Sequence, residues 1–326
     1  MIIAEVGSVH DGSFGNALKL IEAVASTGAD AVKFQSHIAS AESLASAPAP
    51  GYFSDEPRLT YFQRTSFSIV QWRELAAHAV CNGVTFLSSP FSLEAVDLLE
   101  DIGISAYKIP SGEVSNIPLL ERIAMTRKPV LLSSGMSDWN ELDLAVETVR
   151  NSCHTTVMQC SSAYPCPPES VGLNVIGEMA RRYNLPVGYS DHTMGIAAPI
   201  AATALGATVI EKHFTFSRLM YGSDARHSME PDEFRRMCVA LKEVRSMLAT
   251  PVRKADTAPY AEMKQIFEKS IVTARPLFTG TVICRDDLAF KKPGDGISAA
   301  KYKDIIGRRV TVDLPADHKL GYGDLQ

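Results

Sequence analysis

The chain has 326 residues, a formal net charge of -5 and 21% charged residues. This acidic balance argues against a general nucleic-acid-binding protein, and no apolar run approaches the roughly 20 residues that a membrane span needs. An apolar content of 46% is typical of a globular protein, and the length accommodates one large domain and a smaller one.

The amino terminus and the cysteines bear on the compartment. The first twelve residues carry no basic segment and predict a β-strand rather than a secretion signal. The six cysteines form no CxxC pair and show no disulfide-like spacing. Cysteine at this density in a chain of this size indicates reduced thiols, so we expect a cytoplasmic protein.

Eight short apolar runs predict β-strands, and helical spacing follows them, as in Phe14, Leu18, Ile21 and Val24 after the first run. Eight strand–helix units in about 250 residues predict a closed parallel (β/α)8 barrel of the α/β class. A doubly wound sheet is disfavoured because the first strand is not followed by a Gly-rich phosphate turn. The predicted strands are 2–7, 31–35, 85–89, 106–109, 130–134, 156–160, 187–190 and 208–213.

The chain also shows where its domains divide. We expect the barrel in residues 1–249, a polar linker in 250–266 and a small mixed β domain in 267–326. At about 60 residues this domain is near the lower limit for folding alone. The second strand–helix connection, residues 38–69, is long and includes a turn-rich string from Ala47 to Tyr52, which we expect to lie over the active face.

Two histidines stand at matching positions on the last two predicted strands. His192 ends the run that begins at Val187, and His213 ends the run that begins at Val209. Neighbouring strands lie about 4.8 Å apart, so one divalent ion could contact both rings. A single buried histidine is more often a core residue, but the matched pair favours a metal site.

Polar side chains follow the other strands, at the end of a barrel where active sites lie. Lys33 and Lys108, together with several serines, are the residue types that bind phosphate. Glu113 could relay protons or could be a helix N-terminal carboxylate. Asp224 could accept hydrogen bonds from a polyol or could be a turn residue.

Ordered motifs along the chain resemble the sialic acid synthase family. They are IIAEVG, AVKFQ, SSPFS, AYKIPSGE, LLSSGM, QCSSAYP, GYSDHT and IEKHF. KSIVTA, KKPGDGIS and IIGRRV resemble the C-terminal antifreeze-like (SAF) domain of the same family. The resemblance implies condensation of phosphoenolpyruvate with an N-acetylated hexosamine such as N-acetylmannosamine, using Mn²⁺ or Mg²⁺. The products would be a nine-carbon α-keto acid and phosphate.

The resemblance also implies roles for individual residues. The phosphoenolpyruvate site would comprise Lys33, Ser89, Lys108, Ser111, Ser133 and Ser190. His192 and His213 would hold the metal, and Glu113 would be the acid/base residue. The sugar would contact Glu5, Gln35, Ser162, Tyr164, Asp224 and Lys292. Similar synthases are homodimers in which the SAF domain caps the partner's site, so we expect a swapped dimer with Lys292 reaching into the partner's sugar pocket.

Three departures from the family pattern leave the acceptor sugar open. Val9 stands where the family often has Asn, Ser162 where some members have Asn, and Lys292 where bacterial members have Arg. Lysine keeps the charge but loses the planar fork of arginine. Legionaminic, pseudaminic and Kdn-type acid synthases therefore stay open as alternatives. Less favoured are a Schiff-base aldolase using Lys33 or Lys108, a metal-dependent hydrolase, and a non-enzymatic sugar- or ice-binding protein.

Overall fold

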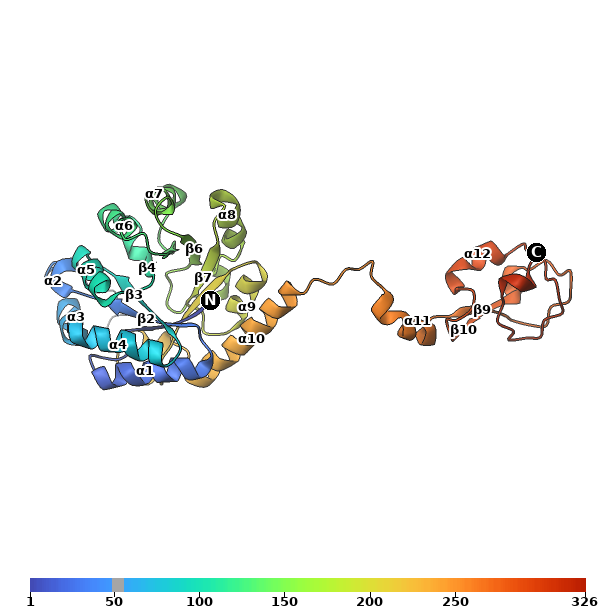
Figure 1. The fold of residues 1–326 in the computed structure, drawn as a ribbon, viewed down its shortest axis with the longest axis horizontal. Coiled ribbons are helices and arrows are strands. Elements are labelled where there is room, and N and C mark those ends of the chain that lie inside the picture. Colours follow the sequence, from blue (N-terminus) through green and yellow to red (C-terminus); the bar gives the residue numbers. More distant parts are fainter. Residues whose placement is uncertain (49–55) are drawn as a thin grey trace. The chain divides into compact units, whose positions relative to one another are not determined.

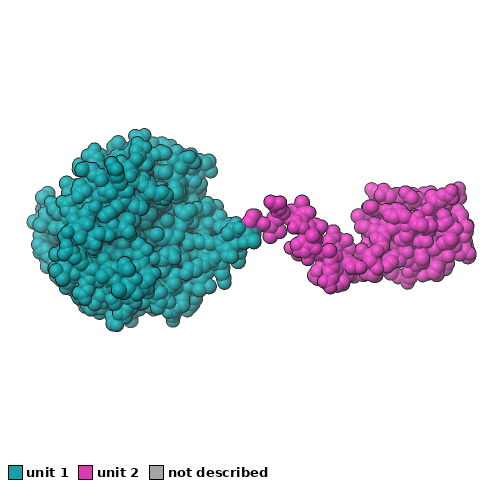
Figure 2. Space-filling view, in the orientation of Figure 1, with its two compact units in different colours: residues 1–250 teal, residues 251–326 magenta. Residues whose placement is uncertain are grey.

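A computed structural model describes residues 1–48 and 56–326 of the protein. The chain divides into two compact units, residues 1–250 and 251–326, which Figures 1 and 2 distinguish. Most of the string from Ala47 to Tyr52 lies outside the described residues, and so does the expectation that it covers the active face.

The first unit is the predicted (β/α)8 barrel. Its eight strands close in chain order, and every neighbouring pair is parallel. Each strand agrees with its predicted range to within one residue at either end. The strands are β1 (Ile2–Gly7), β2 (Ala31–Ser36), β3 (Thr85–Pro90), β4 (Tyr107–Ile109), β5 (Val130–Ser133), β6 (Thr155–Cys160), β7 (Val187–Asp191) and β8 (Val209–His213).

Helices surround the strands, as Figure 1 shows. Capping side chains stabilise the amino-terminal ends of several helices. Ser68 and Gln71 form a reciprocal capping box at the start of α4, and the Ser92 hydroxyl accepts a hydrogen bond from a backbone N–H at the start of α5. Among the described residues, no helix has both the length and the apolarity needed to cross a membrane. The helices are α1 (Phe14–Thr27), α4 (Ile69–Cys81), α5 (Leu93–Ile102), α6 (Ile117–Ala124), α7 (Trp139–Arg150), α8 (Asn174–Tyr183), α9 (Ala197–Ala204) and α10 (Pro231–Ala249).

The barrel interior is layered because strand side chains alternate between two faces. One layer is apolar and consists of Ile3, Ala31, Leu87, Leu131, Met158 and Val209. Two residues further along the same strands, toward their carboxyl ends, stand Glu5, Lys33, Ser89, Ser133, Cys160 and Glu211. A layer of polar and charged groups therefore lies directly above an apolar layer in the barrel interior.

Two short helices lie in the described part of the long β2–β3 connection. They are α2 (Ala39–Glu42) and α3 (Arg58–Thr65). Ala39 of α2 packs with Tyr61 and Phe62 of α3 in a small apolar cluster of their own. This packing fixes α3 against the end of β2, so the connection contributes ordered side chains near the carboxyl ends of the strands.

The second unit has its own core and a small antiparallel sheet, as expected for a mixed β domain. Strands β9 (Ser270–Thr273) and β10 (Leu288–Lys291) pair antiparallel, and α12 (Tyr302–Ile305) is a short helix of the same unit. Elsewhere in this unit an isolated antiparallel bridge joins Val282 and Arg309. A further helix, α11 (Ala261–Phe267), occupies part of the segment expected to be a linker. The core consists of Ile271, Leu277, Ile283, Leu288, Ile297, Ile305, Val310, Leu314, Leu320 and Leu325.

Candidate active site

A cavity of about 390 Å³ opens at the carboxyl ends of the barrel strands. Its walls come from β1–β8 and the loops that follow them, including the described part of the β2–β3 connection. Most of the residues nominated from the sequence line it. These are Glu5, Lys33, Gln35, Ser89, Lys108, Ser111, Ser133, Ser162, Tyr164, Ser190, His192, His213 and Asp224.

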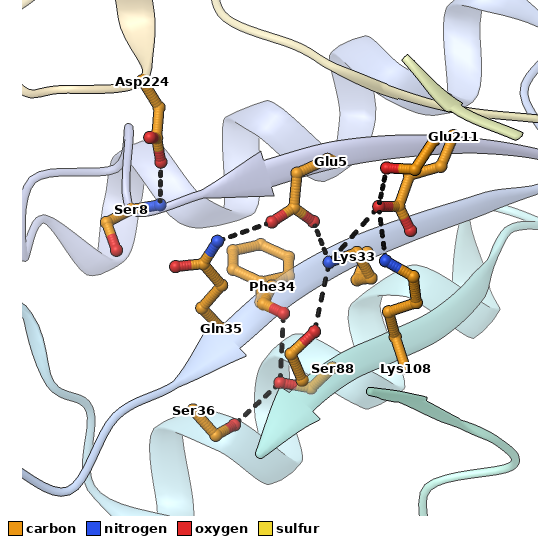
Figure 3. A network of polar contacts seen from close by, with 12 residues as sticks. Glu5, Ser8, Lys33, Phe34, Gln35, Ser36, Ser88, Lys108, Glu211 and Asp224 are labelled. Carbon is orange, nitrogen blue, oxygen red and sulfur yellow. Dashed lines mark hydrogen bonds and ion pairs between the residues drawn. The ribbon is translucent and has the colours of Figure 1, made fainter. Parts of the chain in front are cut away.

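Four charged side chains of alternating sign are buried together in the cavity floor. Lys33 Nζ lies 2.8 Å from Glu5 Oε2 and 3.8 Å from Glu211 Oε1. Lys108 Nζ lies 2.9 Å from the same Glu211 oxygen, to which Ser190 also donates a hydrogen bond of 3.1 Å. All four charged side chains are at most 5% exposed. Figure 3 shows them pointing toward one another from β1, β2, β4 and β8.

Burial and charge pairing set the protonation of this cluster. Burial alone would raise the pKa of Glu211, but the ammonium groups of Lys108 and Lys33 hold it well below its usual value. Burial raises the pKa of Glu5 despite the neighbouring Lys33. Burial would lower the pKa of Lys33, but Glu211 and Glu5 raise it. Lys33 therefore stays charged, and Glu5 is the carboxyl that takes up a proton more readily.

Glu211 is a site residue that the sequence reasoning missed. It stands two residues before His213 on β8, so the period of a strand places both side chains on the inner face. The signal was present, because a charged Glu-Lys pair interrupts an otherwise apolar and buried strand. From the sequence, only His213 on this strand was assigned a role in the site.

Lys212, between those two residues, faces the outer side of the barrel. It is almost fully buried and donates to Asp191 Oδ2 and to the carbonyl oxygen of Thr193. Asp191 Oδ1 in turn accepts from Tyr189 Oη at 2.8 Å and from the Thr193 N–H at 3.0 Å. Asp191 precedes His192 and Lys212 precedes His213, so this ion pair fastens together the strand ends that carry the two histidines.

The two histidines face each other across the end of the cavity. Their ring centroids are 5.6 Å apart, and the Tyr164 ring lies 4.1 Å from His192 and 6.0 Å from His213. His192 Nδ1 lies 2.7 Å from the carbonyl oxygen of Ser161. A carbonyl only accepts, so Nδ1 carries a hydrogen, and Nε2 is the nitrogen that bears the lone pair when the ring is neutral.

His213 also has a nitrogen available for a ligand. Its Nδ1 is buried and has no hydrogen-bond partner among the described residues. Burial lowers the pKa of His213, which keeps the ring neutral, as a metal ligand must be. No three His, Cys, Asp or Glu side chains of residues 1–48 and 56–326 are grouped as a closed metal site. The donors therefore fit an ion held by two imidazoles with its other positions open.

Hydroxyl groups converge from the loops after β4, β5 and β6. The backbone N–H of Gly135 donates to Ser111 Oγ at 3.1 Å. A Cβ atom on Gly135 would lie 2.5 Å from Ser162 Oγ and 2.8 Å from Ser111 Oγ, so only glycine allows this approach. Backbone amides, hydroxyls and two ammonium groups at one cavity end form the expected anion-binding set.

Three of the residues proposed to contact sugar, Glu5, Gln35 and Asp224, lie close together beside β1 and β2. Gln35 Nε2 donates to Glu5 Oε1 at 2.8 Å, and the Ser8 N–H donates to Asp224 Oδ2 at 3.4 Å (Figure 3). Gly7 has a φ of 53°, and a Cβ there would lie 2.5 Å from Asp224 Oδ2. The left-handed backbone at Gly7 thus lets Asp224 reach the cavity beside Gln35.

Two nominated residues are not among those of the first unit that line the cavity: Glu113 lies beside it, and Lys292 belongs to the second unit. Glu113 ends the 3-10 turn that begins at Ser111, accepts a hydrogen bond of 2.8 Å from Asn116 Nδ2, and has its pKa raised by burial. Lys292 is an exposed residue of the second unit, with its ammonium 4.8 Å from the ring centroid of Phe267. Val9 is buried in the hydrophobic core, so this departure from the family pattern changes packing and not the cavity wall.

Other cavity residues come from loops and were not nominated. His37, Arg58, Tyr61 and Phe62 lie on or beside α2 and α3, and Phe91 follows β3. No strand period marks these positions, and only the unusual length of the connection signalled a function. They form an aromatic and basic wall facing the charged floor.

A closed (β/α)8 barrel with its polar cavity at the carboxyl ends of the strands defines a barrel enzyme. Residues 20–253 match the NeuB family, and residues 268–326 match the SAF domain. The chain belongs to the NeuB family, so the resemblance noted from the motifs is confirmed, and so is its order of domains.

Relatives match over nearly the whole chain. The N,N'-diacetyllegionaminic acid synthase of Campylobacter jejuni is 37% identical over 97% of each chain. The human N-acetylneuraminate-9-phosphate synthase is 32% identical over 97% of this chain and 90% of its own. The structure of N-acetylneuraminic acid (sialic acid) synthetase from Leptospira borgpetersenii in complex with citrate has a TM-score of 0.72 and 29% identity. That match covers 80% of this chain and 89% of the other.

The ion pair behind the histidines leads to a stability prediction. Replacing Lys212 with methionine leaves the Asp191 carboxylate buried and unpaired, so we expect a loss of about 3–5 kcal/mol in the free energy of unfolding. Urea denaturation followed by tryptophan fluorescence measures this, because both tryptophans, Trp72 and Trp139, lie in the first unit. The matched control is Lys19→Met, whose exposed pair with Glu22 is screened by solvent and contributes little to stability. Equal losses in the two variants would contradict the prediction.

Proposed function

We propose that the protein is a nonulosonic acid synthase that joins phosphoenolpyruvate to an N-acetylated hexosamine, giving a nine-carbon α-keto acid and phosphate. Membership of the NeuB family supports this proposal. The observation that carries it is the cavity itself, in which Lys33, Lys108 and a group of hydroxyls face two histidines with free ring nitrogens. The end with the lysines and hydroxyls suits a small molecule that bears phosphate and carboxylate groups. The end with the two histidines suits a carbonyl oxygen that is to be polarised.

The state of the lysines argues against a Schiff-base aldolase. A Schiff-base lysine needs a neutral amine, and its pKa is normally lowered to supply one. Here neighbouring carboxylates raise the pKa of Lys33, and Lys108 is held by Glu211 at 2.9 Å. Both groups are thus placed to bind anions as ammonium ions.

The chain's own groups would act in a defined order. Lys33, Lys108 and the serines hold phosphoenolpyruvate so that its enol carbon faces the aldehyde carbon of the open-chain sugar. That carbon attacks the aldehyde, whose oxygen takes up a proton. Water then adds to the carbon bearing the phosphate, and the tetrahedral adduct releases phosphate. Glu113, whose pKa is raised by burial and which directly follows the cavity residues Ser111 and Gly112, would serve as the acid/base residue.

His192 and His213 would hold Mn²⁺ or Mg²⁺. When bound, the ion would polarise the aldehyde oxygen as a Lewis acid. His192 suits this role because the carbonyl of Ser161 fixes its tautomer and ring orientation.

A substrate panel tests the function. Purified protein is incubated with phosphoenolpyruvate and N-acetylmannosamine, its 6-phosphate, or the diacetylated hexoses that precede legionaminic and pseudaminic acids. We expect phosphate release and a nine-carbon acid by mass spectrometry with one of these sugars. In Lys108→Ala the KM for phosphoenolpyruvate should rise roughly tenfold or more, the effect of a lost charge-assisted contact, while the KM for the sugar changes little.

The control for that variant is Lys128→Ala, which removes a lysine paired with Glu100 away from the cavity. It should leave both KM values as in the unaltered protein. A rise confined to the KM for the sugar in Lys108→Ala would show that the fourth strand does not bind phosphoenolpyruvate.

Metal removal gives a separate prediction. Protein dialysed against a chelator should lose turnover and regain it with Mn²⁺, and calorimetry should detect Mn²⁺ binding that His192→Ala abolishes. His154→Ala, which alters an exposed histidine, is the matched control and should bind Mn²⁺ normally. Unchanged Mn²⁺ affinity in His192→Ala would rule out the histidine pair as the site.

We propose further that the protein is a homodimer in which Lys292 of one subunit completes the sugar site of the other. The test mixes a Lys108→Ala protein with a Lys292→Ala protein and exchanges their subunits. Each swapped mixed dimer has one intact site, so activity should return to about a quarter of the unaltered level, because half of the dimers are mixed. Verified exchange with no gain in activity would exclude the swap, as would a monomer in solution.

A further inference from the structure

The imidazole of His37 lies between two phenyl rings at the wall of the cavity. Its ring centroid is 3.7 Å from that of Phe62 on α3 and 4.1 Å from that of Phe91 after β3. Both pairs are stacked with an interplanar angle of 20°. The His37 side chain is only 6% exposed, so the two rings and the cavity wall hold it in a single plane.

Both ring nitrogens of His37 have oxygen partners. Nδ1 lies 3.0 Å and 2.9 Å from the two carboxylate oxygens of Glu42, whose side chain is 3% exposed. Nε2 lies 3.0 Å from Gln35 Oε1. The other end of that amide, Gln35 Nε2, donates to Glu5 Oε1 at 2.8 Å. A continuous chain of hydrogen bonds thus runs from Glu42 through His37 and Gln35 to Glu5 in the charged floor.

The direction of each bond follows from its partners. In its ionised form the Glu5 carboxylate only accepts, so the NH₂ group of Gln35 faces it and the carbonyl oxygen of Gln35 faces His37. Nε2 must then donate, and Nδ1 must donate to Glu42 as well, so the ring carries a hydrogen on each nitrogen. Glu42 balances the resulting charge, and the faces of Phe62 and Phe91 favour a cation between them.

We propose that His37 is a positioning residue, which acts through Gln35 to set the direction of the amide that faces the acceptor sugar. This inference rests on the proposed function. An amide without such a neighbour can turn over, which would place its carbonyl oxygen against the Glu5 carboxylate. His37 prevents this turn because its Nε2–H needs an acceptor, and the carbonyl oxygen of the Gln35 amide can accept while the NH₂ group cannot. The NH₂ group of Gln35 therefore stays directed at Glu5, and the cavity presents one fixed pattern of donors and acceptors to the sugar.

The discriminating variant is His37→Phe. Phenylalanine keeps a flat ring between Phe62 and Phe91 but removes both donors, so it separates stacking from hydrogen bonding. We expect the KM for the sugar to rise roughly tenfold, the effect of one lost charge-assisted bond, with the KM for phosphoenolpyruvate unchanged. The matched control is His78→Phe, at a histidine outside the cavity that pairs with Glu22, which should leave both constants unchanged.

Spectroscopy tests the same inference without turnover. In protein labelled with ¹⁵N, both His37 nitrogens should have the chemical shifts of protonated imidazole. The Gln35 amide resonance, assigned by its absence in Gln35→Glu, should move in His37→Phe. Should His37→Phe fail to fold, Glu42→Gln keeps an acceptor of the same size for Nδ1 and should shift the same Gln35 resonance.

The outcomes separate the two proposals. If no sugar supports turnover in the unaltered protein, the proposed function fails, while the nitrogen shifts still test His37. A neutral His37 ring would overturn the positioning inference. So would a normal sugar KM in a folded His37→Phe protein, or equal rises in both KM values.

Discussion

The buried cluster of Glu5, Lys33, Lys108 and Glu211 is the constraint on which the active site depends. An unpaired charge at this depth would cost several kcal/mol, so each group is held by its neighbours at 2.8–3.8 Å. The cluster joins β1, β2, β4 and β8 across the barrel, and its carboxylates hold both lysine side chains in place. Because two carboxylates already balance two ammonium groups, an anion entering beside Lys33 would raise the pKa of Glu5 further.

This polar layer is possible because the layer below it is apolar. On β1, β2 and β8 the same two-residue step leads from Ile3, Ala31 and Val209 to a charged residue of the cluster. The apolar layer beneath the charges lowers the local dielectric constant, which strengthens their pairing. The charged groups face the open end of the barrel. On the outer face of β7 and β8, Lys212 and Asp191 fasten the strand ends that carry the histidines.

The sequence was informative where a period controls position. Strand alternation and buried apolar runs were enough to predict the eight strands, and matched strand ends were enough to bring His192 and His213 together. Glu211 was missed because its carboxylate was read as part of a strand and not as a partner for lysines. His37 was missed for another reason. Its stacking on Phe62 depends on where α3 packs, and that position follows from tertiary contacts with no local pattern.

This difference bears on how one barrel serves several sugars. The relatives that match nearly the whole chain at 37% and 32% identity carry the names of synthases with different products. Lys33, Lys108 and His213 stand on strands whose register the closed barrel fixes, and His192 directly follows one, so these residues can change little without loss of the site. His37, Arg58 and Phe62 stand on a connection whose path the barrel does not dictate. Residues of that connection are therefore free to alter this wall of the cavity while the charged and hydroxyl groups on the barrel strands stay the same.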